Sequence, residues 1–302
     1  MTGEADPIIR CEGLVHIYKA SGLEVVALQG LDLRVEAGEM LAIVGRSGSG
    51  KTTLMNVLAG IEVPSAGSAE VAGWDLSQLR DRERTGYRRA VVGYVWQHAS
   101  TGLARELSAI QNVELPMMGA RVPWRDRRVR SATLLEQVGL EARRHHRPAE
   151  LSAGEQQRVA MAVALANQPP VLLADEPTGQ LDERTAGRLL EDLRRLQRDL
   201  GVTAVIVTHD QKVAHFADRV VQIRDGRTST ERRWTRGRDE RVEDQPDREE
   251  ELVILDRAGR LQLPRTVVEA ARLGERVRVV LQERGVLILP ADEGEGTNGA
   301  DG

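Results

Sequence analysis

The sequence has little cysteine and no long apolar run. It has one cysteine, Cys11, so no internal disulfide can form, which suits a protein of the reducing cytosol. We expect Cys11 to be a small buried apolar residue. No run approaches the ~20 apolar residues of a membrane helix. The first residues, MTGEADPIIR, lack the apolar stretch of a signal peptide. Any membrane part of the system is therefore expected on another polypeptide.

Lysine is also scarce, because the 42 basic residues include only Lys19, Lys51 and Lys212 as lysines. Arginine is the usual cation of this chain, so a lysine inside a glycine-rich loop suggests a specific role. The net charge of −4 gives no general argument for nucleic-acid binding. A length of 302 residues with 41% hydrophobic and 29% charged residues predicts a globular protein of about two domains.

The composition divides the chain into four parts. Residues 1–227 alternate helical patterns with short apolar runs such as MLAIVG, VLLAD and TAVIVT, which predict buried parallel strands, and residues 120–149 predict a helical insertion. Residues 228–250 carry dense mixed charge and predict a linker. Residues 251–290 predict strand, strand, helix, strand, strand, and residues 291–302 predict a disordered tail.

A phosphate-binding loop follows the run LAIV. GRSGSGKTT precedes the predicted helix TTLMNVLAG, which gives the pattern G-x-x-x-x-G-K-T in its strand–loop–helix context. The glycines let backbone N–H groups turn toward phosphate, and the helix N-terminus adds its dipole. We expect Lys51 to hold the β- and γ-phosphates of a nucleotide and Thr52 to bind Mg²⁺. The predicted contacts from this loop are Gly45, Arg46, Ser47, Gly48, Ser49, Gly50, Lys51, Thr52 and Thr53.

Further polar residues follow three other apolar runs. Because the carboxyl ends of parallel strands meet at one edge of a sheet, where α/β proteins bind ligands, we expect these residues to lie close together. Asp175 can hold Mg²⁺ through water and Glu176 can polarise the attacking water, although adjacent acids at a strand end can also be a solvated turn. His209 suits a γ-phosphate contact, the alternative being a structural histidine. Gln97 can reach both the metal and the water.

A second phosphate-binding signal lies about a hundred residues after the first. LSAGEQQRVA, residues 151–160, places a serine and a glycine at the start of a predicted helix. The first loop already encloses the local nucleotide, so a second site would be redundant within one chain. We therefore expect two copies arranged head to tail, in which LSAGE of each copy closes the γ-phosphate held by the other.

Taken in order, GRSGSGKTT, LSAGEQQRVA, LLADEPTGQLD and VTHD resemble the ATP-binding subunits of ABC transporters over about residues 8–227. The second and third motifs are most similar to the lipoprotein-releasing, macrolide-export and FtsE-like branch, whose ATPases work with permeases resembling MacB or FtsX. The resemblance implies an α/β P-loop NTPase fold with a helical subdomain. It also implies ATP and Mg²⁺ as cofactors.

The resemblance assigns roles to matching positions. It implies catalytic roles for Lys51, Glu176 and His209, a metal site of Thr52, Gln97 and Asp175, and stacking of Tyr18 on adenine, for which a packed strand residue is the alternative. The residues expected to reach the partner's nucleotide are Ser152, Ala153, Gly154, Glu155 and Asp182. Three departures bear on turnover and permease contact: Ala153 replaces the usual glycine, Trp96 replaces the usual phenylalanine before Gln97, and HASTGLARE replaces the commoner asparagine-leucine text that follows.

The segment from 253 to 290 resembles the AbrB/MazE-type swapped-hairpin domain, with the order ββαββ. The resemblance implies either DNA binding or dimerisation alone. Its seven arginines outnumber its four acids, but a solvated arginine-rich surface explains that excess at least as well as phosphate contacts do. Because the segment has no cysteine or histidine, neither a disulfide nor a typical zinc site is available to stabilise it.

These observations predict an ATPase subunit that forms a homodimer and drives a separate MacB/FtsX-like permease from the cytoplasmic face of the membrane. One alternative is an ATP-responsive regulator that binds DNA through its C-terminal domain. Another is an FtsE-like subunit that transmits force to a cell-wall enzyme without moving a substrate.

Overall fold

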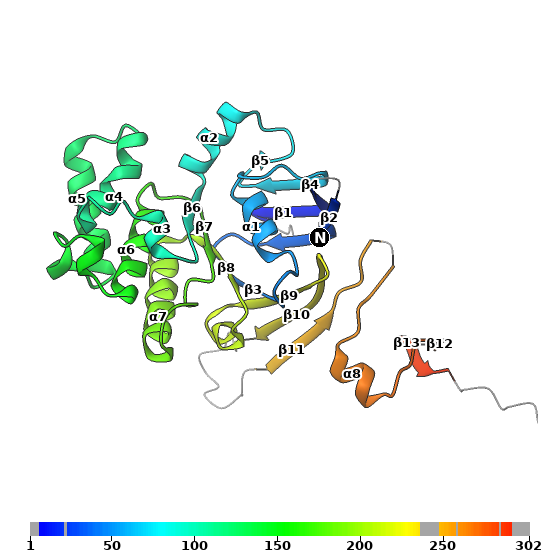
Figure 1. Ribbon diagram of the computed structural model, residues 1–302. Coiled ribbons are helices and arrows are strands. Elements are labelled where there is room, and N and C mark those ends of the chain that lie inside the picture. Colours follow the sequence, from blue (N-terminus) through cyan, green and yellow to red (C-terminus); the bar gives the residue numbers. More distant parts are fainter. Residues whose placement is uncertain (1–5, 21–22, 236–247, 258, 284, 292–302) are drawn as a thin grey trace, which may run out of the picture. The chain divides into compact units, whose positions relative to one another are not determined.

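The computed structural model describes residues 6–20, 23–235, 248–257, 259–283 and 285–291 (Figure 1). The chain forms two units, Met1–Leu252 and Val253–Gly302. Among the described residues, no helix combines the length and the apolar character that crossing a membrane requires.

A seven-stranded sheet forms the core of the first unit. In sheet order, its strands are β11 (Arg248–Val253), β10 (Arg227–Thr235), β9 (Arg219–Arg224), β3 (Met40–Val44), β8 (Thr203–Thr208), β7 (Val171–Asp175) and β6 (Val92–Val95). The five strands from β9 to β6 run parallel to their neighbours, as the runs MLAIVG, VLLAD and TAVIVT predicted. β10 pairs antiparallel with β9.

Both faces of the inner strands β3, β8 and β7 are buried, which explains why these strands are continuous apolar runs. Along β3, Met40, Ala42 and Val44 face one hydrophobic cluster, and Leu41 and Ile43 face the other. The first cluster contains apolar residues of the helical subdomain. The second contains α1 (Lys51–Leu58) and the antiparallel sheet of β2 (Leu23–Val35), β1 (Ile9–Ala20), β4 (Ala66–Val71) and β5 (Trp74–Asp75).

Cys11 is buried in the second cluster, as the sequence predicted. Burial raises the pKa of its thiol to about 12, with a smaller contribution from Asp32, so the thiol stays neutral at physiological pH.

The helical subdomain begins earlier than the predicted insertion at 120–149. After α2 (Asp81–Ala90), its helices are α3 (Ala99–Gly102), α4 (Ala109–Gly119), α5 (Trp124–Gln137) and α6 (Ala153–Leu165), followed by α7 (Glu183–Leu200) next to the sheet. Pro116 lies inside α4 and obscured its helical pattern. The buried Asn112 side chain ties α4 to the preceding loop, because it accepts from the Ala104 amide at 2.7 Å and donates to the Ala104 carbonyl at 3.1 Å.

The predicted domain boundary at 227 and part of the predicted linker differ from the structure. Residues 228–235 belong to β10 and residues 248–250 belong to β11, so the sheet continues past the boundary. Charged residues gave this segment the composition of a linker, but some of these charges are paired within the fold. Residues 236–247, like the predicted tail at 292–302, lie outside the described residues.

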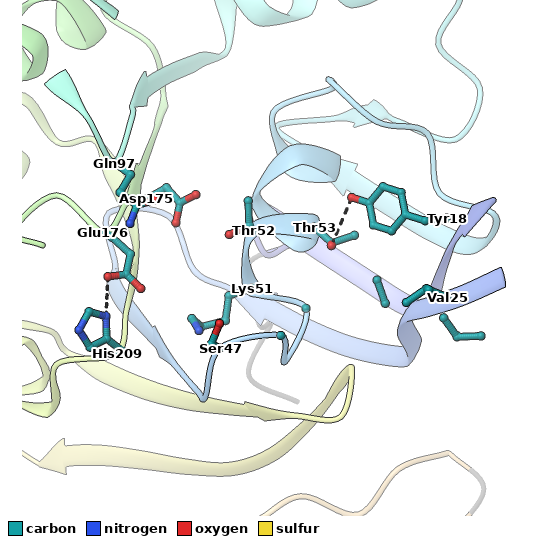
Figure 2. Close-up of a pocket in the computed structure, with 14 residues that line it drawn as sticks. Tyr18, Val25, Ser47, Lys51, Thr52, Thr53, Gln97, Asp175, Glu176 and His209 are labelled. Atoms are coloured by element: carbon teal, nitrogen blue, oxygen red, sulfur yellow. Dashed lines mark hydrogen bonds and ion pairs between the residues drawn. The ribbon is translucent and has the colours of Figure 1, made fainter. Parts of the chain in front are cut away.

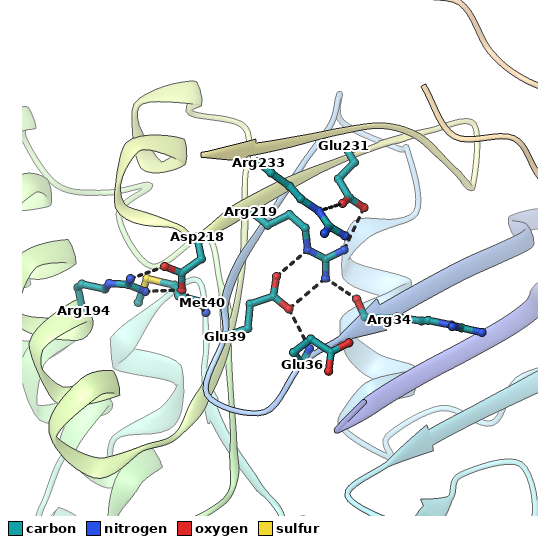
Figure 3. Close-up of polar contacts among 9 residues, drawn as sticks. All are labelled: Arg34, Glu36, Glu39, Met40, Arg194, Asp218, Arg219, Glu231 and Arg233. Atoms are coloured by element: carbon teal, nitrogen blue, oxygen red, sulfur yellow. Dashed lines mark hydrogen bonds and ion pairs between the residues drawn. The ribbon is translucent and has the colours of Figure 1, made fainter. Parts of the chain in front are cut away.

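A buried arginine connects β10 to the core (Figure 3). Arg219 on β9 donates to Glu39 at 2.6 Å and to Glu231 on β10 at 3.0 Å, and it also donates to the Arg34 carbonyl. Burial lowers the pKa of the Arg219 guanidinium, but the bonds to Glu39 and the charge of Glu231 outweigh this effect, and the pKa is raised overall. The guanidinium thus stays charged and links both carboxylates.

The second unit contains α8 (Arg265–Ala270) and an antiparallel hairpin of β12 (Val277–Gln282) and β13 (Gly285–Pro290). The first strand predicted for this region instead joins β10 as β11, and LQLP forms only an isolated bridge between Leu255 and Leu261. None of the described residues from 253 to 291 is buried. The last helix and hairpin thus match the predicted order, and the swapped-hairpin arrangement stays a prediction.

We expect Arg219→Met to lower the free energy of unfolding of the full chain by about 3 kcal/mol, because it leaves the Glu39 and Glu231 carboxylates buried without their cation. Urea unfolding followed by circular dichroism measures this change. Arg80→Met is the matched control, since the Arg80–Glu83 pair is exposed and should contribute nothing measurable. A loss for Arg219→Met as small as that of the control would contradict the buried network.

Candidate functional site

The glycine-rich loop between β3 and α1 lies close to backbone atoms of neighbouring segments. Gly50 has φ of 99° and caps the N-terminus of α1. A Cβ at Gly50 would lie 2.5 Å from the Ala27 carbonyl oxygen, and one at Gly45 would lie 2.4 Å from the Ile223 carbonyl oxygen. Larger residues at these positions would push the loop away from β2 and β9. The glycines are therefore needed both for the backbone conformation and for the close packing.

Lys51 is buried at the first position of α1, with 7% of its surface exposed. Its Nζ donates to the carbonyl oxygens of Gly45 at 2.8 Å and Arg46 at 3.1 Å. These bonds hold the ammonium group against the loop, next to the N-terminus of the helix. A positive side chain and the positive end of a helix dipole at one place make an environment that favours an anion.

A cavity of about 750 Å³ opens beside this loop (Figure 2). Tyr18 and Val25 lie on one side of the start of α1, and Gln97, Asp175, Glu176 and His209 lie on the other. The remaining lining residues are Val26, Ala27, Ser47, Gly48, Gly50, Lys51, Thr52 and Thr53. This distribution of lining residues fits an elongated ligand that has an aromatic ring near Tyr18 and negative charge near Lys51.

Asp175 ends β7 and faces Thr52 across the cavity. Burial raises the pKa of the Asp175 carboxyl, the neighbouring Glu176 raises it further, and a hydrogen bond from Thr52 and the charge of Lys51 counteract these effects. A partly buried carboxylate next to a second acid is stabilised by a cation. The oxygen atoms of Asp175, Thr52 and Gln97 are of the type that Mg²⁺ prefers, and a few protein oxygens with water complete such sites. The donor set therefore fits a magnesium ion.

Glu176 and His209 come together at the ends of β7 and β8. His209 Nδ1 lies 2.5 Å from Glu176 Oε2, and the two side chains are 66% and 15% exposed. Glu176 has φ of 46°, a conformation that is costly for a residue with a side chain, and its amide donates to the Val207 carbonyl at 2.8 Å. Strained backbone of this kind occurs at functional sites, where neighbouring structure fixes one side-chain direction.

Tyr18 on β1 borders the opposite end of the cavity. Its hydroxyl donates to Glu62 Oε1 at 2.9 Å and lies 3.3 Å from Thr53 Oγ1. Burial raises the pKa of the Tyr18 hydroxyl, so it remains protonated at neutral pH and keeps this donor. Its ring, 37% exposed, is available to a planar ligand.

The predicted second phosphate-binding residues lie at two helix N-termini and do not line this cavity. Ser152 caps α6: its Oγ accepts from the Glu155 amide at 3.3 Å, and Glu155 Oε2 accepts from the Ser152 amide at 2.8 Å. Asp182 caps α7 by accepting from the Thr185 amide at 3.0 Å. A Cβ at Gly154 would lie 2.6 Å from Thr185 Cγ2, so the two N-termini are neighbours. Ala153 is exposed between them.

The structure brings most of the predicted single-chain set together around one cavity, with three exceptions. Gly45, Arg46 and Ser49 belong to the loop but do not line the cavity. Val25, Val26 and Ala27 of β2 also line the cavity, although no sequence motif pointed to them. The apolar run LEVVAL is the sequence feature that could have indicated these cavity residues. In the structure, Val25 and Val26 of this run are 60% and 45% exposed.

The comparisons with known proteins identify relatives for most of the chain. The family model described as ABC transporter matches residues 28–179. The lipoprotein-releasing system ATP-binding protein LolD of Ruegeria sp. (strain TM1040) is 46% identical over 219 residues, which cover 72% of this chain and 96% of LolD. The macrolide export ATP-binding/permease protein MacB of Sodalis glossinidius is 46% identical over 221 residues, which cover 73% of this chain. The matched region spans only 33% of that MacB.

Solved structures give the same result. The dimeric structure of MJ0796, a bacterial ABC transporter cassette, has a TM-score of 0.69 and 37% identity, and it covers 76% of this chain and 99% of the cassette. The dimeric post-hydrolysis state of MJ0796 bound to ADP and Pi has the same TM-score with 36% identity and the same coverage. The chain belongs to the ABC transporter family, in which it is an ATP-binding and ATP-hydrolysing domain similar to LolD and to part of MacB.

Proposed function

We propose that this chain is the ATPase subunit of an ABC transporter, and that it drives a separate MacB/FtsX-like permease by ATP-dependent head-to-tail dimerisation. The observation that carries the proposal is the separation of the phosphate-binding residues. The cavity contains the P-loop and the strand-end residues, whereas Ser152 and Asp182 cap helices outside it. One chain therefore presents two incomplete halves of a nucleotide site.

In the first half, the chain binds and orients ATP. Lys51 and the amides of the loop contact the β- and γ-phosphates, while Tyr18 and Val25 contact the base. Thr52, Asp175 and Gln97 would hold Mg²⁺, and the ion would neutralise phosphate charge when bound. Thr52 contributes its hydroxyl and Asp175 its carboxylate. Gln97, which is exposed, can move with the loop that carries it.

Hydrolysis requires a group that accepts a proton from the attacking water. Glu176 is the base in this proposal, because its carboxylate lines the cavity beside Asp175 and its backbone is fixed by the bond to Val207. His209 contacts the same carboxylate and, at 66% exposure, can turn to contact the γ-phosphate. The pair thus positions the water and the phosphate relative to each other.

In the second half, the exposed N-termini of α6 and α7 contact the nucleotide of the partner. Ser152, Ala153, Gly154 and Glu155 belong to the first turn of α6 or cap it, and Asp182 caps α7. Amides at a helix N-terminus bind phosphate. The dimeric MJ0796 cassettes are relatives in which two chains associate. The ATPase dimer binds the permease at the cytoplasmic face of the membrane.

The second unit is proposed to hold two chains together without nucleotide. The described apolar side chains of this unit form no buried core, since Val279, Leu281 and Val286 are 64%, 84% and 60% exposed. A unit of this size rarely folds alone without disulfides, metals or association. A second copy, paired as in an AbrB/MazE-like dimer, would cover these residues. Such a tether raises the effective concentration of the ATPase units to the order of millimolar.

Glu176→Gln should retain ATP binding and lose hydrolysis by a factor of ~10²–10⁴, because the amide keeps the shape of the carboxylate and cannot accept the proton. The variant is expected to accumulate as an ATP-bound dimer. Phosphate release measures hydrolysis, and size-exclusion chromatography of the chain ending at Val253 measures ATP-dependent dimer formation, because the full chain is expected to be a dimer without ATP. Glu191→Gln, an exposed glutamate of α7 outside the cavity, is the matched control and should behave as the wild type. Turnover near the wild-type rate in Glu176→Gln would refute its role as the base.

Mixing Lys51→Ala with Ser152→Ala tests the shared site. Each variant alone is expected to hydrolyse little ATP, the first through weak binding and the second through an incomplete dimer site. A mixed dimer has one site with both lesions and one site with neither, so activity should return in the mixture. Both variants are made in the chain ending at Val253, which is expected to be a monomer without ATP. If its ATP affinity falls equally in both variants, or if mixing restores nothing, the two-chain site is wrong.

Removing the second unit should abolish dimerisation without nucleotide. The truncated chain should end at Val253, since an end at residue 227 would delete β10 and β11 from the sheet. Sedimentation without ATP is expected to show a dimer for the full chain and a monomer for the truncated one. Addition of ATP to a truncated Glu176→Gln variant should restore the dimer. A full chain that sediments as a monomer would rule out this role for the second unit.

A further inference from the structure

A buried histidine supports the tyrosine at the base-binding end of the cavity. The imidazole of His16 and the ring of Tyr18, both on β1, have centroids 4.6 Å apart and meet edge to face at 73°. The His16 side chain is only 8% exposed. His16 belongs to none of the motifs that carry the ATPase chemistry, and it does not line the cavity. Its role therefore has to follow from its own contacts.

Both ring nitrogens of His16 face acceptors. Nε2 lies 2.6 Å from Glu62 Oε2, and Nδ1 lies 3.0 Å from the Val63 carbonyl oxygen. A neutral imidazole has one N–H and could satisfy only one of them, whereas the imidazolium has two. The other oxygen of Glu62 accepts from the Tyr18 hydroxyl at 2.9 Å and the Asn56 amide at 3.3 Å, as an ionised carboxylate does. The geometry thus matches an imidazolium–carboxylate pair.

Glu62 is the centre of this cluster. It lies in the loop after α1, and its two oxygens connect His16 on β1 with Tyr18 on β1 and Asn56 on α1. The Tyr18 hydroxyl also lies 3.3 Å from Thr53 Oγ1, which belongs to the same helix as the P-loop lysine (Figure 2). The Tyr18 hydroxyl is held by Glu62 and Thr53, and the Tyr18 ring packs edge to face with the His16 ring. Its remaining surface borders the cavity.

We propose that His16 is a positioning residue for nucleotide binding. As an imidazolium it fixes the Glu62 carboxylate, which in turn fixes Tyr18 so that the ring presents one face to the base of ATP. The proposal rests on the proposed function, because it needs Tyr18 to contact the base. Ordering one otherwise free side chain on binding weakens affinity by roughly 2- to 13-fold, and the His16–Glu62 pair removes this cost before the nucleotide arrives.

The test compares ADP with inorganic tripolyphosphate, which has phosphates but no base. Isothermal titration of the full chain with His16→Ala is expected to show roughly 2- to 13-fold weaker ADP binding and unchanged tripolyphosphate binding. In hydrolysis assays, KM for ATP should rise by a similar factor, and kcat should not change. His16→Lys should restore ADP affinity, because an ammonium group can donate to both Glu62 and Val63.

Two further variants separate positioning from a general effect on the hairpin. Lys19→Ala removes the exposed pair with Glu24, at 3.0 Å on the same hairpin, and should change neither affinity. Glu62→Gln should weaken ADP binding as His16→Ala does, and the double variant should be no weaker than either single one. Equal loss of ADP and tripolyphosphate binding in His16→Ala, no loss of ADP binding, or failure of His16→Lys to rescue would overturn the proposal. A wild-type chain that binds no ADP would instead contradict the proposed function.

Discussion

The edge of the central sheet at which its parallel strands end is the constraint on which the rest of the structure depends. The loop after β3, Gln97 after β6, Asp175 at the end of β7 and His209 after β8 all meet there because these strands are parallel neighbours in one register. The two-sided core keeps the strands in place, and the close contact of Gly50 with the Ala27 carbonyl keeps the loop against β2. The register of the sheet therefore brings the strand-end side chains to one cavity.

The same arrangement supports the proposal that one chain does not complete its own nucleotide site. The helical subdomain packs on one face of the sheet and ends in the exposed N-termini of α6 and α7, which are stabilised by their own caps at Ser152 and Asp182. Each first turn is held by its own cap, so in the proposed dimer it can present its amides to a nucleotide held by another molecule. The dimeric cassettes among the relatives and the uncovered apolar side chains of the second unit are consistent with a protein that works as a pair.

The sequence predicted the parallel sheet and most of the cavity because both depend on local patterns. Apolar runs such as VLLAD require burial on both faces, and GRSGSGKTT requires a strand before it and a helix after it. What it did not predict depends on partners distant in the chain. The charges of β10 suggested a linker because the pairing of Glu231 with Arg219 depends on the fold. Val25 and Val26 can be recognised as cavity residues only when β2 is placed beside the loop. His16 and Glu62 likewise form a pair only after β1 and the end of α1 pack together. For residues 251–290, the sequence correctly predicted the helix and the last two strands. The first predicted strand is β11, which instead pairs with β10 in the large sheet.

The central claim, a nucleotide site shared by two chains, is tested most directly by disulfide cross-linking. Cys11 is the one native cysteine and is buried, so background cross-linking should be low. One chain carries Arg46→Cys in the exposed part of the P-loop, the other carries Ala153→Cys at the start of α6, and both carry Glu176→Gln. Mild oxidation should produce a disulfide between the two different chains when ATP is present and little without it. Absence of that product with ATP, while each chain still binds ATP, would contradict the shared site.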